Sequence, residues 1–297
     1  MPYNYQHEGK VKMRKFPVAV CLFFMMFFTS LSAYASTDKT GEDEQTLHDE
    51  LCEIGTQIHE QMLQVYSQYK GLNATNIQIK EAGASYQKTL TAKTDVISRY
   101  TTDRQQAIMS GVYGFDAAYA ALFFQKKDMG VFLNAILKVS QNIGSPLQLS
   151  AKMKSLIKNP DSIQDYQAWA DASQEAYNKL LTTGTTSDRD LIVGADILYG
   201  NMIEALYVVT ETIAQADYDP KMLALMNTQH ERIDLLMKIF STFRGNTVFE
   251  KEINFNERFD FIGKLHNFLI ASDFSQIEVD GIRELVVPAR ESILSGS

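Results

Sequence analysis

The sequence has little of what most catalytic and metal-binding sites are built from. Its 297 residues include five histidines and two cysteines. HExxH, CxxC, GxSxG, GxGxxG and P-loop motifs are absent, and so are the Glu-x-x-His pairs of di-iron bundles. These absences exclude the common zinc, haem, nucleotide and serine-hydrolase signatures. We therefore expect no metal, no cofactor and no catalytic residue.

The first 35 residues predict an export signal. Four basic residues within 10–15 precede an apolar run at 16–28, and Ala33-Tyr34-Ala35 matches a small-residue cleavage site. We expect cleavage after Ala35 and a periplasmic or secreted location, with either Met1 or Met13 as the start. An uncleaved membrane anchor is the alternative. No later run looks long and apolar enough to span a bilayer, so we expect no membrane span after cleavage.

The remaining chain, 36–297, is acidic and has one cysteine. It holds 24 basic and 35 acidic residues, a net charge of −11. A chain of this charge without a basic patch is a poor binder of nucleic acid. Cys52 cannot form an intramolecular disulfide, because Cys21 leaves with the signal. It is either a buried inert thiol or a crosslink between two chains, and the sequence leaves the oligomeric state open.

Apolar residues recur at helical spacing through most of this chain. After a flexible leader at 36–45, we expect one all-α domain over 46–297, a bundle of about eight or nine helices. One long helix carries an apolar stripe from Leu47 to Tyr69, and others are expected at 75–100, at 131–143 and after Pro146, Pro160 and Pro220. A Thr/Gly/Ser linker lies at 182–187. A capping box at Ser275–Glu278 opens the last helix, in which Pro288 predicts a kink. No stretch predicts a strand by its alternation, and a short hairpin near 247–255 stays open as an alternative.

Two stretches, 103–126 and 188–215, are expected to be the central helices. In the first, small residues lie on one side of the helix, at Ala107, Ser110, Gly111, Gly114, Ala117, Ala118 and Ala121. An internal glycine costs about 1 kcal/mol relative to alanine, which favours a close approach by a neighbouring helix. Both stretches open with Asp-Arg and contain Tyr-Gly. Either a weak internal duplication or a shared demand for tight packing accounts for this likeness.

Asp116 is the acid in these helices that does not fit a solvated face. Its neighbours on the helix are Tyr113, Tyr119 and apolar residues, so a buried Asp116 needs a partner or takes up a proton. It is either a ligand-binding acid assisted by the two tyrosines or a structural hydrogen-bond acceptor, and structural networks also shift acids. Glu204 shares its side with Asn201 and other polar residues, and is expected to face water.

Two further candidate sites lie in the C-terminal third. Eight of the 12 phenylalanines in 36–297 fall between Phe240 and Phe274. They belong either to the core or to a groove for an apolar ligand or partner helix, for which Phe249, Phe255 and Phe259 are the candidates. His230 lies near Glu231 and Asp234, but their face of the helix is polar throughout, so we expect no metal there.

The runs GVYGFDAAYAALFFQKKDMGVFLNAILKVSQNIG (111–144) and GADILYGNMIEALYVV (194–209) resemble an uncharacterised family of exported all-helical proteins from the envelopes of Gram-negative bacteria. The resemblance covers about a third of the chain. It implies an all-helical fold and an envelope location, and it implies no activity. Many members are lipoproteins, whereas this chain lacks the lipid-attachment cysteine.

The expected function is the non-catalytic binding of a partner protein or a small apolar ligand. Two alternatives stay open. The first is an enzyme with an internal pocket that uses Asp116 and core tyrosines. The second is a purely structural component of the envelope.

Overall fold

The computed structural model describes residues 55–62, 64–65, 74–142, 155, 158–159, 188–270 and 274–296. Within these ranges the chain is helical and contains no β-strand, which confirms the all-α, multi-helix prediction. The export signal, the leader, Cys52, the helix starts at Pro146 and Pro160 and the linker at 182–187 lie outside the described residues.

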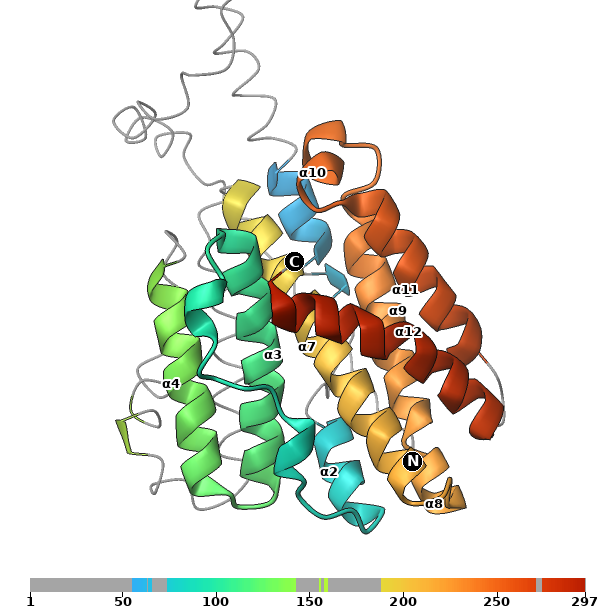
Figure 1. Ribbon diagram of the computed structural model, residues 1–297. Helices are drawn as coiled ribbons and strands as arrows, with labels where there is room; N and C mark the ends of the chain where they lie inside the picture. The colour runs from blue at the N-terminus through green and yellow to red at the C-terminus, as the bar shows by residue number, and fades with distance from the viewer. Residues whose placement is uncertain are drawn as a thin grey trace, which may run out of the picture. The chain divides into compact units, whose positions relative to one another are not determined.

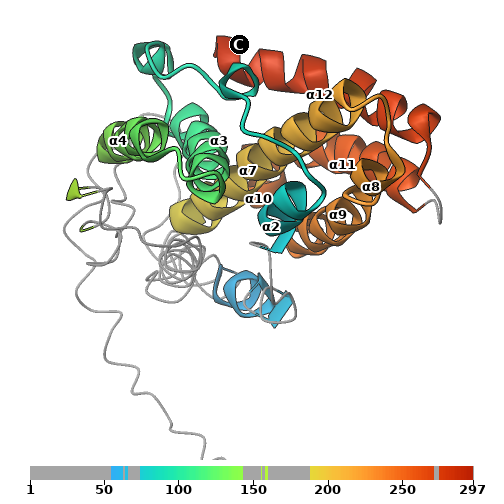
Figure 2. The same cartoon turned by 90° about the horizontal axis from the view of Figure 1, so that it is seen from below.

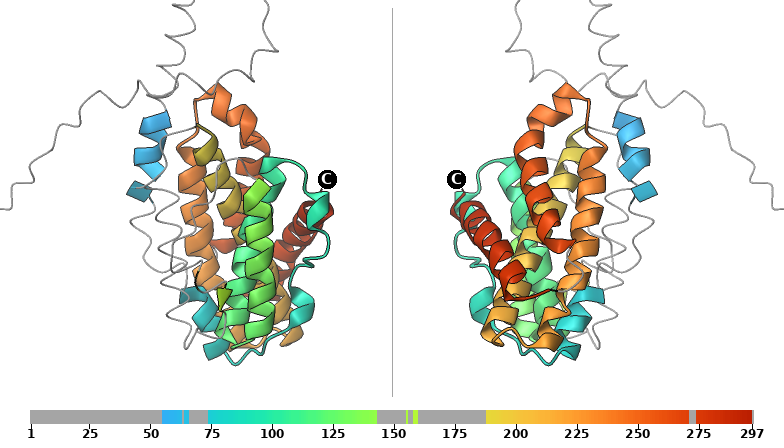
Figure 3. Two further views of the ribbon diagram at one scale, coloured as in Figure 1. Left: turned by 90° about the vertical axis from the view of Figure 1, so that its left-hand side faces the viewer. Right: turned by 90° about the vertical axis from the view of Figure 1, so that its right-hand side faces the viewer.

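α7 lies at the centre of the helices described. The α-helices are α2 (Ala74–Glu81), α3 (Asp103–Leu122), α4 (Lys126–Asn142), α7 (Asp188–Gln215), α8 (Pro220–Leu223), α9 (Met226–Ser241), α10 (Thr247–Glu252), α11 (Phe255–Leu269) and α12 (Gln276–Ser295). In Figure 1, α3 and α4 lie on one side of α7, α9 and α11 lie on the other, and α12 crosses in front. Figure 2 shows α7 between the α3–α4 pair and α9. The two views of Figure 3 show α9 and α11 side by side.

Residues 83–100, which we call the strap, join α2 to α3 and are not helical as a whole. They contain only two single-turn 3-10 helices, η2 (Lys88–Leu90) and η3 (Ile97–Arg99). Figures 1 and 2 show the strap passing over α3 toward the end of α12. The helix expected at 75–100 is therefore wrong beyond Glu81. Gly83, with φ of +97°, breaks it.

Of the other predicted boundaries, three agree with the structure and two do not. The predicted helix 188–215 coincides with α7, and the capping box at Ser275–Glu278 opens α12. Asp219 caps α8 at Pro220. The alternative of a hairpin at 247–255 is wrong, because Thr247–Glu252 is helix α10. α3 ends four residues before the predicted 126, where Phe124 takes a φ of +56°.

α3 and α7 run parallel, and their backbones touch. A Cβ built on Gly111 would lie 2.0 Å from the Ile197 carbonyl oxygen, and one built on Gly200 would lie 2.0 Å from the Ile108 carbonyl oxygen. Asn201 fills the space beside this contact and donates a hydrogen bond to the Gly111 carbonyl (3.3 Å). The predicted close approach of two glycine-bearing helices is thus confirmed, at one glycine on each helix.

Residues 191–215 are the one stretch of the described chain long and apolar enough to cross a membrane. No run this long and apolar was expected from the sequence after the signal. By length and composition, residues 191–215 are such a run, so that expectation is wrong. In the structure, 67% of its most apolar window is buried against other helices. The same apolar character is what a central bundle helix requires.

Replacing Gly111 or Gly200 by alanine should destabilise the protein by about 2–4 kcal/mol, because backbone atoms cannot yield to the added methyl group. Gly194→Ala in the same helix as Gly200 is the matched control, since a Cβ there meets nothing within 4 Å. The control should be neutral or stabilising by up to about 1 kcal/mol. Urea unfolding followed by circular dichroism measures all three. Equal effects would contradict the close backbone contact.

Candidate functional site

Glu204 and Arg290 form a buried ion pair between α7 and α12. Arg290 Nε donates to Glu204 Oε2 (2.6 Å), and Arg290 Nη2 donates to Glu204 Oε1 (2.7 Å). The same Nη2 reaches the Leu90 carbonyl in the strap at 3.0 Å. The guanidinium also lies 3.8 Å from the centre of the Tyr207 ring, a cation–π contact. The expectation that Glu204 faces water is wrong, because the side chain is fully buried.

Asp116 meets this ion pair from α3. Its carboxyl is fully buried, and Oδ2 accepts a hydrogen bond from the Ala92 amide of the strap (2.9 Å). Oδ1 has no hydrogen-bond donor. Glu204 lies within hydrogen-bonding reach of Asp116, but two carboxylates cannot bond to each other. A proton on Asp116 turns this contact into a hydrogen bond to Glu204.

The balance of charge places that proton on Asp116. Two carboxylates and one guanidinium would leave one negative charge uncompensated in the interior, which is costly. Burial, followed by the negative charge of Glu204, raises the pKa of Asp116 well above its ordinary value, although the Ala92 amide and Arg290 oppose the shift. Burial also raises the pKa of Glu204, against the hydrogen bonds from Arg290. Because Arg290 binds Glu204 through two bonds, Glu204 keeps the charge.

Tyr113 and Tyr119 bind the strap rather than an open pocket. The Tyr113 hydroxyl donates to the Lys93 carbonyl (3.0 Å). The Tyr119 hydroxyl donates to the Ser85 carbonyl (3.3 Å) and accepts from the Gln87 amide (3.2 Å). Burial raises the pKa of both tyrosines, so both hydroxyls stay protonated at neutral pH. The structure thus brings together the three residues predicted as a ligand site, with strap backbone as their partner.

Asp196 of α7, which directly precedes the Ile197 carbonyl in contact with Gly111, is a second buried acid. Arg104 of α3 binds it with Nε and Nη2 (2.6 and 3.0 Å), and Arg258 of α11 donates to Oδ1. The Arg258 guanidinium also lies 4.7 Å from the centre of the Tyr199 ring. This cluster ties α3, α7 and α11 together.

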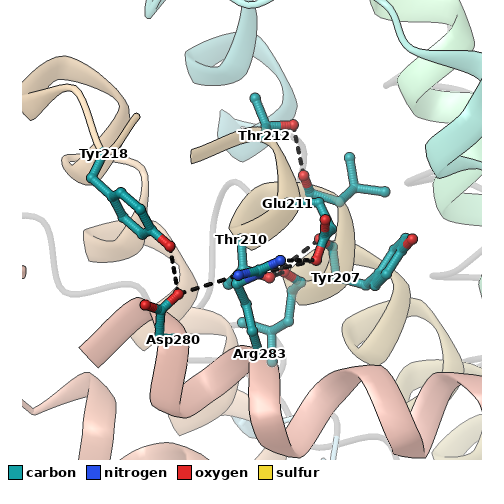
Figure 4. Close-up of polar contacts among 9 residues, drawn as sticks. Tyr207, Thr210, Glu211, Thr212, Tyr218, Asp280 and Arg283 are labelled. Atoms are coloured by element: carbon teal, nitrogen blue, oxygen red, sulfur yellow. Dashed lines mark hydrogen bonds and ion pairs between the residues drawn. The ribbon is translucent and has the colours of Figure 1, made fainter. Parts of the chain in front are cut away.

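A second ion pair between α7 and α12 joins Glu211 to Arg283 and is more exposed than that of Glu204 and Arg290. Figure 4 shows this outer pair. Arg283 donates to Glu211 Oε1 from Nε (3.0 Å) and Nη2 (2.9 Å), and to Asp280 Oδ1 from Nη1 (3.2 Å). The Tyr218 hydroxyl donates to the same Asp280 oxygen at 2.6 Å. Arg283 precedes Arg290 by seven residues, and Glu211 follows Glu204 by seven. The two antiparallel helices are therefore held in one register.

A sequence signal for these acids exists, although a helical wheel does not reveal it. An acid followed three residues later by tyrosine occurs as Asp116-Ala-Ala-Tyr119, Asp196-Ile-Leu-Tyr199 and Glu204-Ala-Leu-Tyr207. All three acids are fully buried. In the two α7 copies, the tyrosine ring lies under the arginine that binds the acid. In these two copies the motif marks a buried acid that is bound by an arginine, and the arginine packs on the tyrosine ring.

The phenylalanines proposed for a groove lie mainly in the core. Phe249 and Phe255 are buried. Phe259 is half-buried, stacks on Phe255 with centroids 5.1 Å apart, and is covered by the Arg244 guanidinium at 4.6 Å. The described structure gives these rings a packing role, and the groove interpretation does not fit Phe249 or Phe255.

In the part of the chain described, neither the histidines nor the hollow between α7 and α9 forms a metal site or a ligand pocket. The rings of His230 and His266 lie 5.5 Å apart between α9 and α11, and no group of three or more ligand side chains gathers around them or elsewhere in that part. A hollow between α7 and α9, lined mainly by Leu198, Met202 and Ile239, has a volume of about 30 Å³. That is room for about one water molecule.

No protein-family model, curated protein or solved structure matches this chain.

Arg290→Leu should cost about 3–5 kcal/mol, because it leaves the Glu204 charge buried without a partner. Arg283→Leu is the matched control on the same helix. Its ion pair is partly exposed, so it should cost about 1 kcal/mol or less. Chemical unfolding at pH 7 compares the two variants. Similar losses would show that the inner pair is not desolvated as the structure has it.

Proposed function

We propose that the protein is an exported, non-catalytic binding protein. The observation that carries this proposal is the state of the core acids. Asp196 and Glu204 are each bound to arginine, and Asp116 lies under the strap. The partners of these three side chains are arginine guanidinium groups and strap backbone, which favours a structural role for them. The export signal predicted from the sequence supports a periplasmic or secreted location.

Within the part of the chain that the structure describes, we favour a partner protein over a small apolar ligand. The hollow between α7 and α9 is far below the roughly 300 Å³ of a ligand pocket. Large apolar side chains are instead exposed at the end of α11 and the start of α12, where Ile270 is 58% and Ile277 is 77% accessible. We propose that a partner protein covers these two side chains, because an apolar side chain gains free energy when it leaves water. We place the partner at this corner.

Native mass spectrometry of the full protein, purified from the periplasm of its own source, tests the proposal. A retained protein that is lost in Ile277→Asp and kept in Val131→Asp supports it. Val131 of α4 is the matched control, because it is an exposed apolar residue on a different helix. A retained small molecule would favour the apolar-ligand alternative. A protein that retains nothing would favour the structural envelope component.

A second candidate, an enzyme that uses Asp116, Tyr113 and Tyr119, is favoured by one observation. A buried carboxyl with a strongly raised pKa is typical of active-site acids. Asp116→Asn separates the two functions. If Asp116 is structural, the variant binds the retained molecule as the parent does. Loss of turnover or binding with the fold intact would favour the enzyme.

A further inference from the structure

The strap is held by side chains from outside it rather than by its own backbone. Tyr113, Tyr119 and Asp116 of α3 bind four of its backbone groups, and Arg290 of α12 binds a fifth, the Leu90 carbonyl. At its outer side, Tyr86 and Lys88 of the strap donate to Asp128 of α4. A segment attached in this way can detach without unfolding any α-helix.

Two of these attachments belong to the buried cluster of Asp116, Glu204 and Arg290, in which Asp116 carries a proton. The Ala92 amide binds Asp116, and the Leu90 carbonyl binds Arg290, which holds Glu204. With a proton on Asp116, the buried cluster is neutral. Without it, the cluster carries one net negative charge beneath Leu90 and Ala92, both of which are buried. Water can reach that charge if the strap moves away.

We propose that residues 83–100 form a proton-controlled latch, closed over Asp116 while that carboxyl is protonated and opened when the proton is lost. This latch does not depend on the proposed partner-binding function. It gives the exported chain a response to the pH of its surroundings.

The direction of the pH effect follows from linkage. In the open form water reaches Asp116, so the desolvation that raises its pKa is lost and the pKa falls toward the ordinary value of 3.8. In the closed form, burial and Glu204 hold the pKa of Asp116 well above that value. Closure therefore takes up a proton between the two values. The closed form is favoured fully below pH 3.8. As pH rises between the two pKa values of Asp116, the ratio of closed to open protein falls by up to about tenfold per pH unit.

The neighbours of Asp116 define which other groups can contribute. Glu204 faces it from α7, Arg290 from α12, Tyr113 and Tyr119 from α3, and Tyr86 from the strap. Asp128 of α4 acts through Tyr86, and Asp95 of the strap acts through Tyr113. Burial raises the pKa of all three tyrosines, so they stay neutral through the window. Glu204 contributes in the same direction as Asp116, because its pKa is also raised.

Hydrogen exchange of the full-length protein, read by mass spectrometry from pH 5 to pH 9, tests the latch. Protection factors, corrected for the intrinsic rate, are compared between peptides covering 84–96 and reference peptides of α9. In the parent, strap protection should fall with pH by up to about tenfold per unit, while α9 protection stays constant. If the protection factors of the strap in the parent protein change with pH no more than those of α9, the proposal is overturned.

Three variants separate the proton from the other attachments. Asp116→Asn should reduce the pH slope of strap protection to the part that Glu204 contributes, because the amide accepts from Ala92 and donates to Glu204 without titrating. Glu204→Gln should also reduce the slope, since Asp116 then balances Arg290 without a proton. Tyr119→Phe removes an uncharged attachment. It should lower strap protection at every pH and leave the slope unchanged.

A pH slope in Asp116→Asn equal to that of the parent also overturns the latch. If the variants do not fold, a carbon-13 carboxyl titration of the parent decides the question. One aspartic acid must then titrate well above the others, and a titration in which every aspartic acid has an ordinary pKa overturns the proposal.

Discussion

The contact between the backbones of α3 and α7 is the constraint on which the other features depend. Gly111 and Gly200 let the two parallel helices approach until carbonyl oxygens lie where a methyl group would otherwise be. Because the helices are parallel, every pair across them has a similar separation in sequence, 92 residues for Arg104 and Asp196 and 90 for Asn201 and Gly111. A similar offset brings Asp116 to Glu204. Side chains larger than glycine at the crossing would hold these carboxyls apart.

Once two carboxyls meet in the interior, the surrounding elements follow from electrostatics. A single arginine cannot neutralise both, so α12 supplies Arg290 and one carboxyl keeps a proton. A buried pair of this kind is a poor source of stability, because desolvation offsets much of the attraction. Its value lies in specificity, since only one register of α12 places Arg290 at Glu204 and Arg283 at Glu211. The strap takes its course from the same groups.

Local patterns in the sequence predicted the helices well and the polar core poorly. The small-residue face of α3 predicted the close approach, because an internal glycine weakens a helix unless a neighbouring backbone needs the space that it leaves. Glu204 was misplaced because its helix neighbours are polar, and a helical wheel cannot show that α12 covers that face. The strap was misread as helix because the partner of its Leu90 carbonyl, Arg290, lies 200 residues away. Separations of this length leave no periodic signal.

A raised pKa in a buried acid is compatible with both catalysis and structure, so access must decide between them. A catalytic acid exchanges its proton with a substrate in every cycle, whereas the Asp116 carboxyl is fully buried between the Ala92 amide of the strap and Glu204. In the closed form, its proton therefore has no route to a ligand. Opening of the strap would supply that route, but it would also return the pKa toward its ordinary value and remove the proton at neutral pH. If the strap opens as proposed, the burial that raises the pKa of Asp116 and access of a substrate to it cannot occur together, which is the physical reason for proposing a structural role rather than general acid catalysis.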